Sequence, residues 1–462
     1  MSEDRLEPVK RDAPHPPTRG AASPPPGSLI RDAGDEDSAR VGFIELFFDL
    51  VYVFAITQLT HHLAKHPDWA HAAQTGILFL AIWLTWNFTT WSINLLDPDR
   101  AMVRLMLGFA MLGSLIAAAA IPTAFTSNPI AFALPYVLVL IGGGLFMILA
   151  LRKANPEGAS NFKRATLWFL IAAGLWLWGA DAPPAERYYW WGAAVFVQYL
   201  APLLRFRFPG VGGARKTDWH LSGEHMAERC ALFIIIALGE GIIVTGTTFA
   251  DAGLDYESGL ALAAAVVSSF AMWWVYFDIG AERGSEYIDQ HDDPGNFARL
   301  AYTFGHIPIV AGIVLVAVSD EMSLADPLAP ANAVYTLVIT AGGLAFVLGT
   351  ALFKKISGGK PKYPLSHLVG AVYFAALGLA GWLWKPQMLV FASAHAAGFI
   401  FIALWEWVSF HGGWLDRLER RGVALPAWLT RRSRARMREL EGHDDDDEEA
   451  AAAPPSSPAT QR

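Results

Sequence analysis

Three carboxylate side chains lie inside long apolar stretches of this chain and are its clearest candidates for chemistry. Glu45 and Asp49 fall in the apolar stretch 41–63, and Glu240 falls in the stretch 230–250. Placing a carboxylate in the hydrocarbon core of a membrane costs about 2.5 kcal/mol or more on insertion scales. Acids that persist in such places bind ions or protons, or form pairs with a neighbouring helix.

Glu45 and Asp49 are four residues apart, so on a helix they lie on one face, one turn apart. Two carboxylates this close in a medium of low dielectric constant do not both ionise freely. Three arrangements are open: the pair shares a proton, binds a cation, or forms a salt bridge with an Arg on another helix. Glu45 is also compatible with a merely interfacial place near the end of its helix, whereas Asp49 lies about 6 Å deeper.

Glu240 lies near the middle of its apolar stretch, between Gly239 and Gly241. Two glycines beside a buried acid predict that the backbone of another helix approaches closely there. Thr247 follows on the same helical face and adds a hydroxyl. The alternative is a structural acid that is hydrogen-bonded to a neighbouring helix.

His306 and Pro308 share the stretch 299–319. The proline frees a backbone carbonyl and can kink the helix. His306 is a candidate for a proton path, with packing inside the bundle as the alternative. The candidate ion or proton pathway therefore consists of Glu45, Asp49, Glu240, Thr247 and His306.

Motifs of enzymes are missing from the sequence. There is no His-Glu-x-x-His zinc motif and no Gly-x-x-x-x-Gly-Lys-Ser/Thr phosphate loop, and no Gly-x-Ser-x-Gly elbow. The single cysteine, Cys230, excludes an internal disulfide and a thiolate metal site. The sequence predicts neither an enzyme nor a resident cofactor or metal, and it lacks the basic surface typical of nucleic-acid binding.

The elements that must position these residues are membrane helices. The chain of 462 residues is 53% hydrophobic and 17% charged, against about 25% charged in soluble domains. Stretches of about 20 apolar residues can cross a hydrocarbon layer of about 30 Å, and lipid allows helices because they satisfy their own backbone. We therefore predict an all-α polytopic bundle of about twelve helices. The predicted spans are 41–63, 73–95, 103–124, 129–151, 164–181, 187–206, 230–250, 258–279, 299–319, 331–353, 364–384 and 388–410.

Lys and Arg alternate strongly between the two sets of connections, which predicts the orientation. The basic residues of one set are Arg100, Arg104, Arg152, Lys153, Lys163, Arg164, Arg205, Arg207, Arg215, Lys216, Arg229, Arg283, Arg299, Lys354, Lys355, Lys360 and Lys362. The other set holds only Lys65, Arg187 and Lys385. We expect a multi-pass protein of the cytoplasmic membrane with both termini in the cytoplasm.

The chain divides into two six-helix halves and two tails. The Pro-rich segment 1–40 and the basic-then-acidic segment 413–462 are predicted to be largely disordered cytoplasmic tails. The halves are 41–206 and 230–412, joined by a cytoplasmic connector at 207–229. Both halves offer an acid, then a Trp, then an Arg-Leu pair, in the order Asp49, Trp86, Arg104-Leu105 and Glu240, Trp274, Arg299-Leu300. Because each half contains an even number of spans, we predict that the halves are parallel repeats about an axis normal to the membrane.

Two strings resemble the signatures of a known family. They are Glu45-Leu-Phe-Phe-Asp49-Leu-Val-Tyr52-Val-Phe-Ala and Leu232-Phe-Ile-Ile-Ile-Ala-Leu-Gly-Glu240. They are similar to the bacterial low temperature requirement A (LtrA) family, over roughly residues 40–412, although Tyr52 stands where Phe is frequent. The resemblance implies a bacterial membrane protein linked to growth in the cold, without an established molecular activity.

The buried acids favour a channel or transporter for a cation, a proton or a small solute coupled to protons. The alternative is a membrane scaffold or stress-adaptation factor whose acids are structural. The expected partners are the lipid bilayer and an unidentified ion or solute, and the sequence is compatible with a homo-oligomer. Anionic lipid headgroups are a further candidate at Arg431, Arg432, Arg434, Arg436 and Arg438.

Overall fold

The protein is all-α in the residues that its computed structural model describes, which are 28–31, 41–213, 223–252, 255–277, 297–357 and 363–410. These residues form twelve α-helices, a short 3-10 turn and a π-helical turn. The α-helices are α1 (Phe43–Lys65), α2 (Trp69–Asn94), α3 (Ala101–Ala119), α4 (Pro129–Leu151), α5 (Pro156–Asp181), α6 (Pro184–Leu203), α7 (Gly223–Ala252), α8 (Tyr256–Phe277), α11 (His306–Ala325), α12 (Ala333–Ser357), α13 (Leu365–Trp384) and α14 (Met388–Phe410). The 3-10 turn η2 covers Ile121–Thr123, and the π-helical turn η3 covers Arg299–Phe304.

Each of the twelve predicted spans overlaps one of these helices, and ten of the helices are long and apolar enough to cross a membrane. The two that do not meet this criterion are α5 and α6. Their sequences are rich in Trp and Tyr, including the run Tyr188-Tyr-Trp-Trp191 in α6, and such amphipathic rings prefer the membrane interface to its centre. Their outer faces still carry exposed apolar side chains such as Leu170, Ile171 and Phe196.

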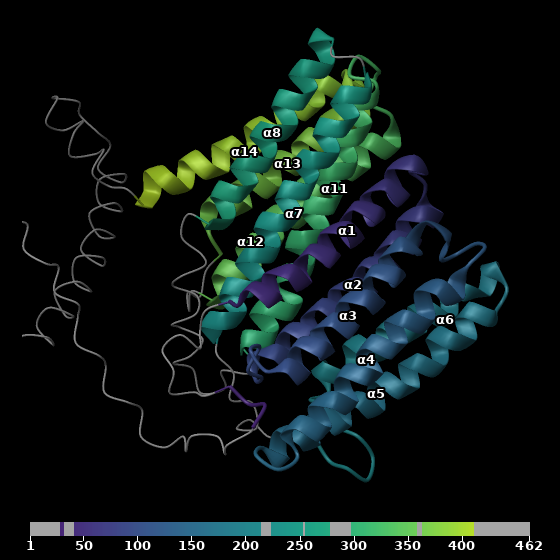
Figure 1. Cartoon of the computed structure of the whole chain (residues 1–462). Helices are drawn as coiled ribbons and strands as arrows, with labels where there is room; N and C mark the ends of the chain where they lie inside the picture. The colour runs from purple at the N-terminus through teal and green to yellow at the C-terminus, as the bar shows by residue number, and fades with distance from the viewer. Residues whose placement is uncertain are drawn as a thin grey trace, which may run out of the picture.

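Helix α1 lies at the centre of the molecule, between the two halves of the chain (Figure 1). It packs against α2 and α3 of its own half, and against α7 and α11 of the other. Helices α3, α4, α5 and α6 pack in sequence order away from it, and α2 contacts α4 and α6. Residues on α1 therefore reach both halves at once.

The second half packs in a comparable order. Helix α7 contacts α8 and α11, α11 contacts α12, and α13 lies between α12 and α14. Helix α11 is preceded by the π-helical turn η3, which leaves a backbone carbonyl available, and Trp83 of α2 donates to Thr303 O at 2.8 Å. The sequence predicted a kink here from Pro308, and the structure places the irregular turn just before it.

The glycines that bring helix backbones together are not the ones predicted. A Cβ on Gly239 would meet nothing within 4 Å, and one on Gly241 would lie 3.8 Å from Ala317, which is ordinary contact. A Cβ on Gly312 would instead lie 2.6 Å from the Phe346 backbone nitrogen. The close backbone approach therefore joins α11 to α12, since small residues allow it there.

The largest boundary errors fall at polar helix starts. The connector was expected to run to residue 229 and the fifth span to begin at 164, but α7 begins at Gly223 and α5 at Pro156. Composition alone missed about two turns of polar helix in each case. The predicted tails 1–40 and 413–462 lie outside the described residues, apart from 28–31.

Candidate functional site

Asp49 forms an ion pair with a residue that the sequence analysis had assigned to a loop. Its Oδ1 accepts from Arg229 Nη2 of α7 at 2.6 Å and from Trp86 Nε1 of α2 at 2.8 Å. The Asp49 and Arg229 side chains are fully buried. Of the three arrangements left open by the sequence, the structure therefore contains the salt bridge to an Arg on another helix.

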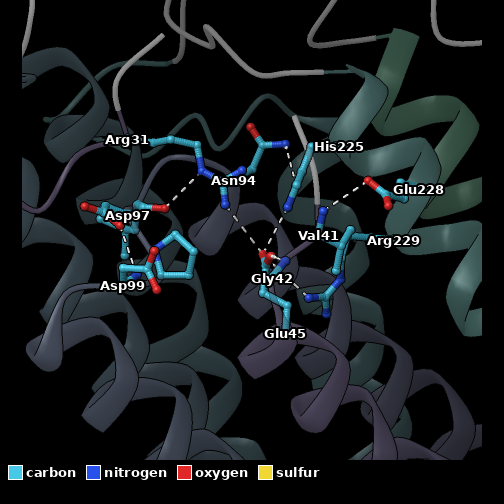
Figure 2. A network of polar contacts seen from close by, with 12 residues as sticks. Arg31, Val41, Gly42, Glu45, Asn94, Asp97, Asp99, His225, Glu228 and Arg229 are labelled. Carbon is cyan, nitrogen blue, oxygen red and sulfur yellow. Dashed lines mark hydrogen bonds and ion pairs between the residues drawn. The ribbon is translucent and has the colours of Figure 1, made fainter. Parts of the chain in front are cut away.

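Glu45 lies one turn earlier on α1 and is also fully buried. Its Oε1 is 3.0 Å from His225 Nε2 and 3.6 Å from Arg229 Nη1, and its Oε2 accepts from the Gly42 backbone at 2.7 Å. The side chain therefore caps its own helix and binds α7 at the same time. Figure 2 shows His225 and Arg229 converging on Glu45.

The polar contacts around His225 assign its tautomer. Asn94 of α2 places its amide nitrogen 3.3 Å from His225 Nδ1. An amide nitrogen only donates, so Nδ1 accepts, and Nε2 carries the hydrogen that Glu45 accepts. Arg31 approaches Glu45 Oε1 at 3.7 Å from before α1. Burial lowers the pKa of Arg31, and the charge of Glu45 partly offsets this effect.

Glu240 is the acid with the fewest partners of the three predicted ones. It is buried on α7 and accepts a short hydrogen bond from the Thr57 hydroxyl of α1. Thr57 also lies 3.1 Å from its own Val53 carbonyl. Within the described ranges, no Lys, Arg or His side chain lies within ion-pair distance of Glu240.

A second pair connects α1 and α11 one turn beyond Thr57. His61 Nδ1 lies 3.2 Å from both carboxylate oxygens of Glu321. The side chains are 34% and 19% exposed, so this end of the α1 interface is open to its surroundings. Ala317, one turn before Glu321 on α11, lies next to Gly241. The His61–Glu321 pair therefore lies about one helical turn, or 5.4 Å, beyond the level of Glu240.

The acids on α1 and α7 lie at different depths. Contacts between the helices advance in the same direction, from Asp49–Arg229 to Thr57–Glu240. The helices therefore run parallel, and Glu240 lies about 16 Å beyond Arg229 along α7. Asp49 and Glu240 therefore lie at different depths, whereas equivalent positions of the predicted parallel repeat would lie at one depth.

Two predicted pathway residues lie apart from these acids. Thr247 is exposed, and its hydroxyl donates to Val244 O of its own helix at 2.8 Å. His306 is fully buried, with Nδ1 2.9 Å from Ala301 O and Nε2 2.8 Å from the Tyr276 hydroxyl. It lies about 16 Å along α11 from Ala317. The structure gathers Glu45 and Asp49, and leaves Glu240, Thr247 and His306 elsewhere.

The sequence did not identify three residues that contact Glu45 or Asp49. They are His225, Arg229 and the hydrogen-bond donor Trp86. The available signal was the polar string Glu224-His225-Met-Ala-Glu228-Arg229 directly before an apolar run. Its His and Arg are four apart, as Glu45 and Asp49 are, so two one-turn pairs of opposite type could face each other. Arg229 was instead counted among loop residues.

The strings that contain these residues also match a family model. The model of the bacterial low temperature requirement A protein (LtrA) matches residues 40–404, from just before α1 to well inside α14. The chain belongs to the LtrA family. With ten helices in its described part suited to span a bilayer, this LtrA-family chain is a multi-pass membrane protein whose apolar outer surface contacts lipid.

A curated relative extends this assignment without adding an activity. An uncharacterized protein of Rhizobium meliloti (strain 1021) is 34% identical over 377 residues, which cover 81% of this chain and 90% of that protein. No solved structure matches the chain. The arrangement of side chains is therefore the main source for a functional proposal.

Proposed function

We propose that this LtrA-family protein moves a proton, a cation or a proton-coupled small solute across the membrane, with Glu240 as the binding carboxylate. The observation that carries the proposal is a buried carboxylate that accepts a hydroxyl hydrogen bond and has no cationic partner among the described side chains. A charge in that place is costly unless it is neutralised. Binding and releasing a proton or cation would neutralise it in turn.

The pair His61–Glu321 supports a route to one side. It provides two titratable groups about one turn from Glu240, and both are partly exposed. A proton or cation could therefore reach Glu240 from the end of α1 that carries His61. Histidine and carboxylate side chains in a row are typical of proton relays in membrane proteins.

Buried aromatic rings pack beside Asp49. Trp86 donates to Asp49 and stacks on Trp83, and Phe233 of α7 packs against both tryptophans. Tyr52 is held by Ser114 at 2.9 Å. We infer that Asp49, Glu45 and Arg229 form a closure at this end rather than the binding site itself.

The scaffold alternative is supported by the same ion pairs. Asp49 and Arg229 join α1 to α7, and thus the two halves of the chain, in a fully buried salt bridge. If all acids serve this purpose, replacing Glu240 would change stability and nothing else. The two proposals therefore differ in what they expect of Glu240.

The test is ion and proton flux into proteoliposomes that contain wild type or Glu240→Gln. Glu224→Gln is the matched control, because Glu224 is exposed on the same helix. We expect flux in wild type and in Glu224→Gln and its loss in a folded Glu240→Gln. Equal flux in all three overturns the assignment of Glu240, and absence of proton or cation flux in well-inserted wild type favours the scaffold.

We also propose the topology and the repeat. The excess of Lys and Arg on one set of connections supports cytoplasmic termini, and the similar order of neighbours in α1–α6 and α7–α14 supports two parallel halves. Single introduced cysteines in a Cys230→Ala background, labelled from either side, test the topology. Cys230 is buried, so its replacement leaves the surface unchanged.

A further inference from the structure

Asp320 is a buried carboxylate on α11, one residue beyond the predicted span 299–319. The structure places it inside the helix, which continues to Ala325, and only 7% of the residue is exposed. Within the described part of the chain, no hydrogen bond or ion pair to Asp320 is present. An ionised carboxylate buried without a partner carries a large desolvation cost.

Hydroxyl groups lie on the same stretch of α11 and on α12. Ser319 directly precedes Asp320 and Ser323 follows it by three residues, and both are buried. The charge of Asp320 acts on the Tyr335 hydroxyl of α12, which also interacts with Ser323. Among the described residues none of these hydroxyls is hydrogen-bonded to Asp320, so the carboxyl group has no partner in this conformation.

Two of these hydroxyls already donate their hydrogen to a backbone carbonyl. Ser319 donates to Val316 O at 2.7 Å, and Tyr335 donates to Met388 O at 3.2 Å. Each hydroxyl has one hydrogen and two lone pairs, so both can only accept from a further neighbour. An ionised carboxylate is itself acceptor-only. A protonated carboxyl group could donate to them, and would match its surroundings.

Other charges do not compensate Asp320. Glu321 is directed at His61 of α1. Titratable side chains on the helices around α11 have partners elsewhere: Glu240 with Thr57, Tyr276 with His306, Glu406 with Lys354, Lys355 with Tyr363, His71 with Asp68, and His395 with the rings of Phe374 and Phe399. No cation from these elements lies within ion-pair distance of Asp320.

We propose that Asp320 is a second proton-binding site, which holds its proton at neutral pH among the hydroxyls of Ser319, Ser323 and Tyr335. Proton binding converts the carboxylate to a neutral carboxylic acid that donates one hydrogen bond. A metal ion fits less well, because no group of three or more His, Cys, Asp or Glu side chains in the described residues could hold one. The site is separate from Glu240 and does not depend on transport through it.

Infrared spectroscopy of the full-length protein in lipid at pH 7 tests this site, because a protonated carboxyl group and a carboxylate absorb at different frequencies. Asp320→Asn is compared with Glu321→Gln, its neighbour on the same helix, whose partner is His61. We expect a carboxylic-acid band of wild type to disappear in Asp320→Asn and to remain in Glu321→Gln. Asp320→Glu provides a second variant, in which the band shifts instead of disappearing.

Stability gives an independent result. Asparagine has the shape and neutrality of a protonated aspartic acid. The unfolding temperature of Asp320→Asn should therefore lie within a few degrees of the wild-type value. Identical carboxylic-acid bands in wild type and Asp320→Asn overturn the proposal. A sodium- or potassium-dependent rise of the unfolding temperature that is lost in Asp320→Asn also overturns it, in favour of a bound alkali cation. Neither result depends on whether Glu240 supports flux.

Discussion

Buried acids have many partners near one end of α1 and few near the other. At the Glu45 end, Glu45 and Asp49 share Arg229 and each has at least one further donor. Toward the other end, Glu240 has a hydroxyl partner only, and Asp320 on the neighbouring helix has none among the described residues. Breaking the ion pair of a buried acid costs free energy, and so does keeping a buried acid charged without a partner. The first pattern is that of a structural lock, and the second is that of a binding site.

The largest expected effect is that of Arg229→Leu. It removes the cation of the fully buried Asp49 and one of the cations beside Glu45, which keeps Arg31 at 3.7 Å. Removing one partner of a buried ion pair costs about 3–5 kcal/mol, so we expect a loss of this order in the free energy of unfolding, measured in detergent. Adding Glu45→Gln and Asp49→Asn to the same chain should recover most of the loss. An Arg229→Leu protein as stable as wild type would remove the lock from the comparison.

Asp49→Asn and Glu240→Gln should separate stability from activity. Asp49→Asn leaves Arg229 less compensated, and we expect a loss of about 3 kcal/mol. Glu240→Gln changes one hydrogen bond from Thr57 and should cost about 1 kcal/mol or less. Among folded proteins, Glu240→Gln should reduce flux more than Asp49→Asn. Equal destabilisation by both changes would show that Glu240 is as structural as Asp49.

Two neighbouring tryptophans measure the contribution of charge to the lock. Trp86 and Trp83 stack on each other at 5.0 Å, but Trp86 donates to the Asp49 carboxylate and Trp83 donates to a neutral carbonyl. Hydrogen bonds to charged groups contribute about 1.5–3 kcal/mol, and neutral ones about 1 kcal/mol. Trp86→Phe should therefore lower unfolding stability more than Trp83→Phe. The reverse order would indicate that ring packing, and not the charge on Asp49, dominates.

The smallest effect concerns an exposed acid outside the spans. Asp68 caps α2 through the His71 backbone and ring, and the hydrogen bond from the His71 backbone lowers the pKa of Asp68. A lowered pKa in the folded state means that the contribution is present above the unfolded value, about 3.9, and is lost as pH falls through the folded value. We expect Asp68→Asn to flatten the pH dependence of thermal unfolding slightly in this acidic range. An unchanged pH profile would show that this cap contributes nothing through its charge.

Some elements could be predicted because their cause is local. The spans 129–151 and 388–410 were predicted with the observed bounds of α4 and α14, since a continuous apolar run reports its own length. Glu45 and Asp49 were recognised as one site for the same reason, because helical spacing places them on one face. The polar first turns of α7 lack such a signal, and Arg229 was misassigned there.

By itself, the sequence determined that this chain is an LtrA-family bundle of membrane helices and that its buried acids need an explanation. Which acid receives a cation was decided only by the tertiary structure. Arg229 lies 180 residues from Asp49, and α7 had to lie parallel to α1 at a particular depth to bring them together. The same register placed Glu240 beside Thr57 and left Asp320 among hydroxyls, because a carboxylate's neighbours in a bundle come from other helices.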